Sequence, residues 1–202
     1  MEFFTLALLA ITIGVSYWAF NDGQLMDKLL LYPKRMNSPA EYYRLISNGF
    51  VHADWQHLIF NMVTLYFIGS YVEQYFALLG NRNLYLFLYL FGVVASAIPS
   101  FIKHRSDPYY RSLGASGGTS AVLFSMVYTS PWLKITFFFV PMWSILFAVL
   151  YVVYSIYMSQ QRRDNINHDA HLWGAVFGFV FTYAFDPSHG AYFMQQIMHP
   201  PF

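Results

Sequence analysis

The sequence contains no cysteine and few charged side chains. Without cysteine the chain has no disulfide bonds, no thiolate metal ligands and no cysteine nucleophile. Only 10% of its 202 residues are Asp, Glu, Lys or Arg, whereas a soluble domain carries about 25%. The net charge is +1 and no basic run is present, so the sequence predicts no nucleic-acid partner. The composition favours a protein that lies in a membrane.

Hydrophobic residues make up 57% of the chain and recur in long stretches between short polar connections. Each stretch is near the 17 to 25 residues that cross about 30 Å of hydrocarbon. We therefore predict an all-α fold, a polytopic membrane helix bundle of six transmembrane helices, at residues 3–20, 57–79, 84–102, 114–130, 135–158 and 170–185. The first stretch follows only Met1-Glu2, without the Lys or Arg of a signal peptide, so we expect a retained helix.

The predicted helices form one domain over residues 1–185. Residues 186–202 are a short polar C-terminal tail that we expect to be poorly ordered. The long connection 21–56 mixes charges with aromatic residues, a composition typical of the membrane interface.

Polar side chains stand at the N-terminal ends of alternate predicted helices. These ends share one face, because helices two apart in sequence cross a membrane in the same direction. The second helix carries His57 and Asn61 one turn apart, the fourth carries Ser116, and the sixth carries His171. Ionisable groups in transmembrane segments cost about 2.5 to 3.5 kcal/mol, so such a group is a functional-site hypothesis. We expect the four side chains to converge.

Together these residues have the chemistry of acyl transfer. Ser116 needs a base before it can attack a carbonyl, and the imidazole of His171, with an ordinary pKa of about 6.5, suits that role. The backbone N–H groups of Ser116 and Gly117, with the side chains of His57 and Asn61, could form an oxyanion hole.

No acid completes a triad with these residues. Asp169 is two positions from His171 and faces another direction on a helix, while Asp164 lies outside the predicted span. A Ser116–His171 dyad is therefore favoured. Taken singly, Ser116 is more often a helix N-cap and His171 a packing residue.

Glycines stand where two of these helices would have to approach each other. Gly114 and Gly117 flank Ser116, and Gly174 and Gly178 form a GxxxG pattern after His171. Small residues of this kind let helices pack closely in a membrane.

Three motifs resemble the rhomboid family of intramembrane serine proteases over about residues 43–185: Gly114-Ala115-Ser116-Gly117, Ala170-His171 with Gly174 and Gly178, and His52 followed by His57 to Asn61. The resemblance implies a six-helix core that cleaves single-pass membrane proteins within or near their transmembrane segments, without a metal or a cofactor. It implies Ser116 as nucleophile, His171 as general base, and His57 and Asn61 in the oxyanion hole. The implied partners are the transmembrane segments of substrates, and membrane lipid.

The resemblance also implies structural residues and shows one departure. Arg44 and His52 would brace the first loop, and Glu73 falls where the family often has a structural glutamate. Many bacterial members carry a tyrosine four residues after the serine, stacked on the catalytic histidine, but position 120 is a serine here. A neighbouring aromatic ring would then have to hold His171.

The family's topology places the N-terminus in the cytoplasm and the active site toward the outer side of a bacterial cell membrane. Lys and Arg oppose this orientation, because two would be cytoplasmic (Arg82 and Lys134) and nine outside (Lys28, Lys34, Arg35, Arg44, Lys103, Arg105, Arg111, Arg162 and Arg163). We retain the family's topology, because a first loop embedded in the interface would inflate the outer count.

Other functions predict features that the sequence lacks. A transporter would show broken helices or paired charges at the midplane, a zinc protease His-Glu-x-x-His, and an aspartyl protease two intramembrane aspartates. The alternative that stays open is an inactive rhomboid-like protein that binds and escorts or retains transmembrane clients. Such members usually lack the serine or the histidine. In the protease hypothesis, the fifth helix and an adjoining loop form a lateral gate for substrates.

Overall fold

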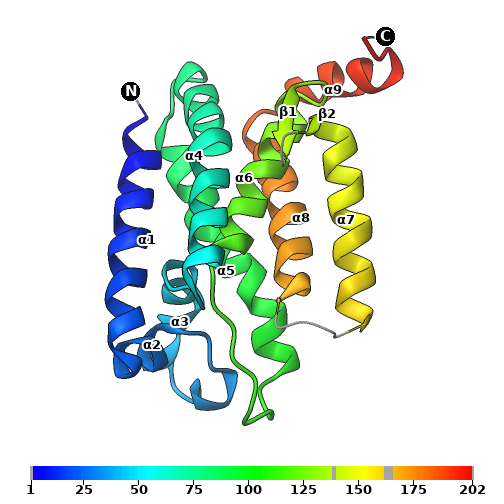
Figure 1. The fold of residues 1–202 in the computed structure, drawn as a ribbon. Helices are drawn as coiled ribbons and strands as arrows, with labels where there is room; N and C mark the ends of the chain where they lie inside the picture. Colours follow the sequence, from blue (N-terminus) through cyan, green and yellow to red (C-terminus); the bar gives the residue numbers. More distant parts are fainter. Residues whose placement is uncertain (1, 138–139, 162–165, 202) are drawn as a thin grey trace.

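The computed structural model describes residues 2–137, 140–161 and 166–201, which form a helical bundle with one β-hairpin (Figure 1). The helices are α1 Phe3–Asn21, α2 Gly23–Leu29, α3 Arg44–Ser47, α4 Trp55–Leu78, α5 Asn83–Lys103, α6 Ser116–Thr129, α7 Ser144–Gln161, α8 His168–Phe185 and α9 His189–Met198. Strands β1 Lys134–Phe137 and β2 Val140–Trp143 pair in antiparallel fashion. Short 3-10 turns cover Pro33–Arg35, Pro39–Glu41 and Asn48–Phe50.

Each of the six predicted spans contains a helix of 14 residues or more, and the all-α bundle is confirmed. Helices α4, α6 and α8 run in one direction, opposite to α1, α5 and α7, so the N-terminal ends of α4, α6 and α8 lie toward the same end of the bundle (Figure 1). By length and composition, three of the described helices (α1, α5 and α7) are suited to cross a membrane. The count of six spans stays a prediction.

Helix α6 is short and central. Its 14 residues extend about 21 Å, less than the hydrocarbon thickness of about 30 Å, so one end of this helix lies below a membrane surface. All of its residues except Ser116 and Phe124 are buried. Because α4, α5, α7 and α8 all contact it, the polar start of α6 is enclosed by the bundle.

Two glycines let α8 touch α6 backbone to backbone. A Cβ atom at Gly174 would lie 2.3 Å from the carbonyl oxygen of Gly117, and one at Gly178 would lie 2.0 Å from that of Ala121. Both distances are too short for any side chain. The backbones of α6 and α8 are therefore in direct contact near the N-terminal ends of both helices.

The predicted fifth span was wrong at its start. Residues 134–137 and 140–143 form the two strands of the β-hairpin, and α7 begins at Ser144 rather than at residue 135. Pro141 explains the difference, because proline lacks the N–H that a helix interior needs and clashes with the preceding turn. The hydroxyl of Ser144 donates to the carbonyl oxygens of Ser130 and Pro131 at 2.7 and 2.8 Å, which fixes the start of α7.

The tail that was expected to be poorly ordered forms helix α9. The Trp132 indole N–H donates to the carbonyl oxygen of Gln196 at 2.7 Å. The Tyr128 hydroxyl donates to the carbonyl oxygen of Asp186 at 2.7 Å, just before α9. These bonds tie α9 across the end of the bundle opposite the predicted site (Figure 1).

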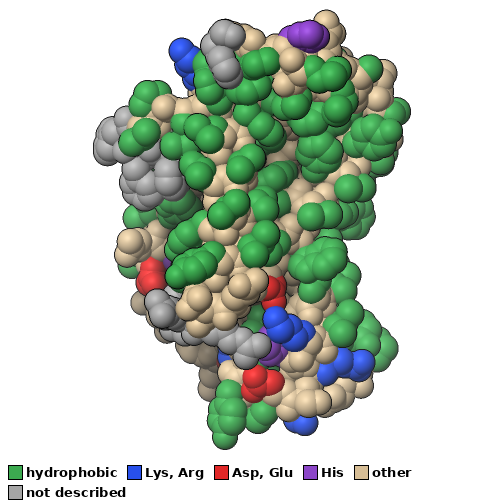
Figure 2. All heavy atoms as spheres, turned by 90° about the vertical axis from the view of Figure 1, so that its right-hand side faces the viewer, with side chains coloured by type: hydrophobic (Ala, Val, Ile, Leu, Met, Phe, Trp, Pro, Cys, Tyr) green, Lys and Arg blue, Asp and Glu red, His purple; other side chains and the backbone are tan. Residues whose placement is uncertain are grey.

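The molecular surface carries a broad hydrophobic band. On the face shown in Figure 2, Lys and Arg side chains gather toward the end where α8 begins, apart from one at the opposite end. Hydrophobic side chains cover most of the space between. A band of this kind suits the hydrocarbon region of a bilayer.

Candidate active site

Ser116 is the first residue of α6 and is half-buried. The N-cap position of this helix is Ala115, and no side chain makes a cap hydrogen bond there. The carbonyl oxygen of Ser116 accepts hydrogen bonds from the hydroxyls of Thr119 and Ser120, at 3.1 and 2.7 Å. The serine hydroxyl therefore does not serve as a helix cap, the ordinary role of a serine at this place.

His171 lies in the first turns of α8, on the side of the bundle where α6 begins. Asn167 caps α8, its side-chain oxygen accepting from the Ala170 N–H at 3.1 Å. A Cβ atom at Gly117 would lie 3.8 Å from the carbonyl oxygen of Ala170, and Gly174 presses on Gly117 from the next turn. The turn that carries His171 thus packs on the turn that begins with Ser116.

The two polar residues of α4 contact the serine segment on both sides. The His57 ring lies against Gly114, where a Cβ atom would be 2.6 Å from Cε1 of the ring. Asn61 is buried, donates to the carbonyl oxygen of His57 at 3.0 Å, and accepts from the Thr119 hydroxyl at 3.3 Å. The structure therefore brings α4, α6 and α8 together at the predicted site.

His52 holds the chain immediately before Ser116. Its Nε2 accepts from the Ala115 N–H at 3.2 Å, and its Nδ1 lies 2.9 Å from the hydroxyl oxygen of Ser16, which itself donates to the Phe50 carbonyl. This pattern places the ring proton on Nδ1. Burial, with a smaller effect of His57, lowers the pKa of His52 to about 3, so the ring is neutral. The His52 ring also packs edge-on against His57, with 4.9 Å between centroids.

The nearest carboxylate on α8 is engaged elsewhere. Asp169 accepts a hydrogen bond from Nζ of Lys103 at 2.6 Å and another from the hydroxyl of Ser159. Its two oxygens therefore face α5 and α7. Asp164, also considered above, lies outside the described residues.

Sequence reasoning did not identify Tyr151 of α7, whose ring stacks on His171. The ring centroids are 5.7 Å apart and the planes differ by 23°. The Tyr151 hydroxyl lies 2.5 Å from that of Ser120, the position where the family pattern has its tyrosine. In the sequence, the serine at position 120 indicated that another aromatic ring must contact His171. It did not indicate which helix would supply that ring.

Two further residues hold the framework of the site. The Glu73 carboxylate is buried and accepts from the N–H groups of Phe4 and Thr5 at 3.0 and 2.8 Å, so it caps the start of α1. Arg44 is buried beneath the first loop and donates to the carbonyl oxygens of Asp27 and Leu30 at 2.7 and 3.0 Å.

The fold and the site together define a class: a polytopic helical membrane protein with serine and histidine on adjoining turns inside the bundle. The comparison with known families agrees. The Rhomboid domain matches residues 39–187, most of the chain, and the chain belongs to the rhomboid family. It is an integral membrane protein.

Three curated relatives from Arabidopsis thaliana are similar to the chain. RHOMBOID-like protein 12, mitochondrial, is 25% identical over 180 residues, which cover 81% of this chain and 52% of the relative. Rhomboid-like protein 11, chloroplastic, is 27% identical over 160 residues (73% and 53%). RHOMBOID-like protein 4 is 28% identical over 159 residues (78% and 38%). The chain spans about half the length of the first two relatives.

Proposed function

We propose that the protein is an intramembrane serine endopeptidase that cleaves single-pass membrane proteins within or near their transmembrane segments. The observation that carries the proposal is the packing of the α8 turn 170–174 on the first turn of α6, with a Cβ atom at Gly174 only 2.3 Å from the Gly117 carbonyl oxygen. Close packing of these two turns supports a direct contact between the side chains of Ser116 and His171.

In the proposed reaction His171 takes the hydroxyl proton of Ser116 as the serine oxygen bonds to the scissile carbonyl carbon. The carbonyl oxygen becomes an oxyanion, which the backbone N–H of Gly117 and the side chains of His57 and Asn61 stabilise. The carbon–nitrogen bond then breaks, and His171 gives the proton to the leaving amine. Water, deprotonated by His171, hydrolyses the acyl-enzyme and restores Ser116.

Substrates reach this site from the lipid, beside α7. Only Ser144, Ala148 and Ser155 of α7 are buried, so this helix is attached more loosely than α6. The proposed substrates are therefore transmembrane segments that unwind next to α7 and present a carbonyl to Ser116. Loose packing of α7 supports the gate proposed for this helix and its adjoining loop.

The proposed location is a bacterial cell membrane, with the N-terminus in the cytoplasm and the start of α6 toward the outer side. The topology of the rhomboid family, retained in the sequence analysis, supports this orientation. The relatives above are named mitochondrial and chloroplastic, and those words apply to them. Of the nine outer cations, Arg162 and Arg163 lie outside the described residues, and Arg44 is buried within the first loop.

The test is cleavage of a single-pass test substrate by purified protein in liposomes. Ser116→Ala and His171→Ala should each lower the rate at least about 1000-fold while the proteins stay folded. Ser38→Ala and His199→Ala, which change exposed residues of the same types, should cleave normally. If the unmodified protein binds the segment without cutting it, the inactive client-binding alternative replaces the protease.

A further inference from the structure

The ring of Tyr151 connects α7 to both catalytic candidates. On one side it stacks on His171, with centroids 5.7 Å apart. On the other its hydroxyl bonds to Ser120 at 2.5 Å. The Ser120 hydroxyl donates in turn to the carbonyl oxygen of Ser116 at 2.7 Å, so Tyr151 is the donor to Ser120. A continuous path of contacts thus joins α7 to His171 and to the backbone of Ser116.

The ring of Tyr151 is stacked on His171 in an orientation that can fix the plane of the imidazole. The second ring against His171 is that of His168, which meets it edge-on at 76° and 5.5 Å from the same helix. Tyr151 is the nearly parallel one, at 23°. A stacked ring restricts rotation of the imidazole about its bond to Cβ, which is the rotation that aims its nitrogen at Ser116.

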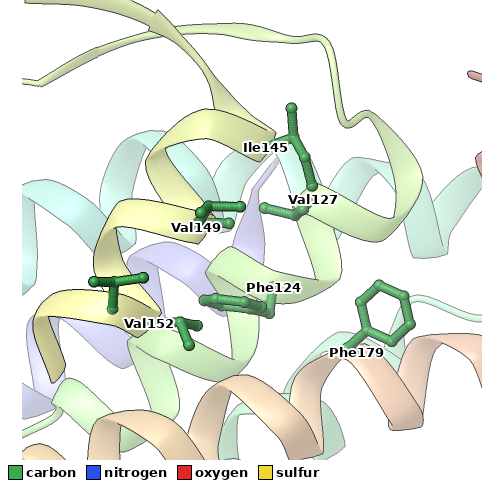
Figure 3. Close-up of a pocket in the computed structure, with 8 residues that line it drawn as sticks. Phe124, Val127, Ile145, Val149, Val152 and Phe179 are labelled. Carbon is green, nitrogen blue, oxygen red and sulfur yellow. The ribbon is translucent and has the colours of Figure 1, made fainter. Parts of the chain in front are cut away.

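Helix α7 is held to the bundle unevenly. Toward its N-terminal half an apolar groove of about 250 Å³ separates it from α6 and α8 (Figure 3). Phe124 and Val127 of α6, Phe179 of α8, and Ile145, Val149 and Val152 of α7 line this groove. Helix α7 makes polar contacts with the site through Tyr151, which bonds to Ser120, and Ser159, which bonds to Asp169. Few residues of α7 are fully buried, so these contacts help to define its position at the site.

We propose that Tyr151 is a positioning residue that orients His171 toward Ser116 only while α7 lies against α6 and α8. The inference rests on the proposed proteolytic function and adds its regulation. A substrate that displaces α7 removes the ring from His171, and the catalytic alignment returns when α7 closes on the unwound segment. Helix α7 therefore has two states: an open state in which substrate enters, and a closed state in which His171 is aligned with Ser116.

The test compares variants in kcat, KM and the pH profile of kcat. Tyr151→Leu should lower kcat at least about tenfold with little change in KM, and should move the acidic limb of the profile, because the environment of His171 changes. Tyr151→Phe keeps the stacked ring and loses the bond to Ser120, so it should lose only a fewfold in kcat. Tyr157→Leu is the matched control, since Tyr157 lies on the same helix with its side chain exposed.

A relocated ring separates positioning from general packing. In Ser120→Tyr with Tyr151→Leu, the new ring grows from α6 into the space that Tyr151 leaves, and it should restore most of the lost kcat. This double variant should also make kcat independent of added Ser159→Ala, a change that loosens α7. In the unmodified protein Ser159→Ala should lower kcat, because the ring moves with α7.

The outcomes distinguish the two proposals. If the unmodified protein cleaves and His171→Ala does not, but Tyr151→Leu matches Tyr157→Leu in kcat and pH profile, the positioning role is wrong and the protease stands. If Tyr151→Leu unfolds, the same conclusion follows when Ser159→Ala keeps full kcat, both by itself and combined with Tyr151→Phe, because the position of α7 would then not affect His171. If the unmodified protein never cleaves, the proposed function itself has failed.

Discussion

Gly114 is the residue at which one added methyl group would disturb the site most directly. Its φ is +121°, and a Cβ atom would lie 2.6 Å from Cε1 of His57. We predict that Gly114→Ala lowers the free energy of unfolding by about 2 to 4 kcal/mol, from backbone strain plus overpacking, and abolishes most cleavage. Thermal unfolding in detergent and the cleavage assay measure both effects.

Gly80 supplies the control for Gly114. It also has a positive φ, +86°, yet nothing lies within 4 Å of its Cβ position. Gly80→Ala should therefore show the backbone cost alone, about 1 to 2 kcal/mol, with normal cleavage. Equal activity in the two variants would show that the contact between Gly114 and His57 does not matter for the reaction.

His52 makes the stability of the protein depend on pH. Its pKa is about 3 in the folded protein and about 6.5 when unfolded, so between these values only the unfolded chain takes up the proton. The free energy of unfolding should therefore fall on acidification below pH 6.5, by up to about 1.4 kcal/mol per pH unit. His52→Gln should be less stable at pH 7 and should lose less on going to pH 4.5. If both proteins lost the same free energy of unfolding between pH 7 and pH 4.5, groups other than His52 would cause the pH dependence.

At the scale of residues, the sequence predicted the side chains that lie at helix starts. Ser116, His171, His57 and Asn61 followed from the direction of alternate helices and from the motif resemblance. Tyr151 did not, because its contact with His171 depends on how α7 packs. Helical periodicity predicts on which face of α7 the ring lies, but it does not predict which residue of another helix that face contacts.

Among the elements, the contact between α6 and α8 decides whether the site forms. We predict that Gly178→Ala lowers the free energy of unfolding by about 1 to 3 kcal/mol and reduces cleavage, because its methyl group would meet the backbone of Ala121 and separate the helices. Thermal unfolding and cleavage rates test this.

Gly14 in α1 is the matched control, with nothing within 4 Å of its Cβ position. Gly14→Ala should be neutral or up to about 1 kcal/mol more stable, since alanine favours a helix. A Gly178→Ala protein as stable as Gly14→Ala would mean that α6 and α8 tolerate a wider separation than the structure shows.

The elements themselves were predicted unequally well. Long hydrophobic stretches located six helices within two residues at most ends, because burial in lipid or protein demands apolar side chains along a whole helix. The paired strands 134–137 and 140–143 were missed, although Pro141 was a signal against a helix there. Helix α9 was missed because its ordering depends on tertiary bonds such as that from Trp132 to Gln196.

For the whole molecule, the open question is its direction in the membrane. The absence of cysteine makes the chain suited to single-cysteine labelling. Lys34 and Asn81 are both exposed, in the loops at the site end and at the opposite end. In intact bacterial cells, Lys34→Cys should react with a membrane-impermeant maleimide, and Asn81→Cys only after permeabilisation. The reverse pattern would favour the orientation that the Lys and Arg distribution suggests.

The central claim is that Ser116 is a nucleophile activated by His171. The most direct measurement is the site and rate of modification by a fluorophosphonate probe, located by mass spectrometry on the purified protein. We predict one adduct, on Ser116, formed at least about 100-fold more slowly in His171→Ala. An unmodified Ser116, or an adduct that forms equally fast without His171, would contradict the account.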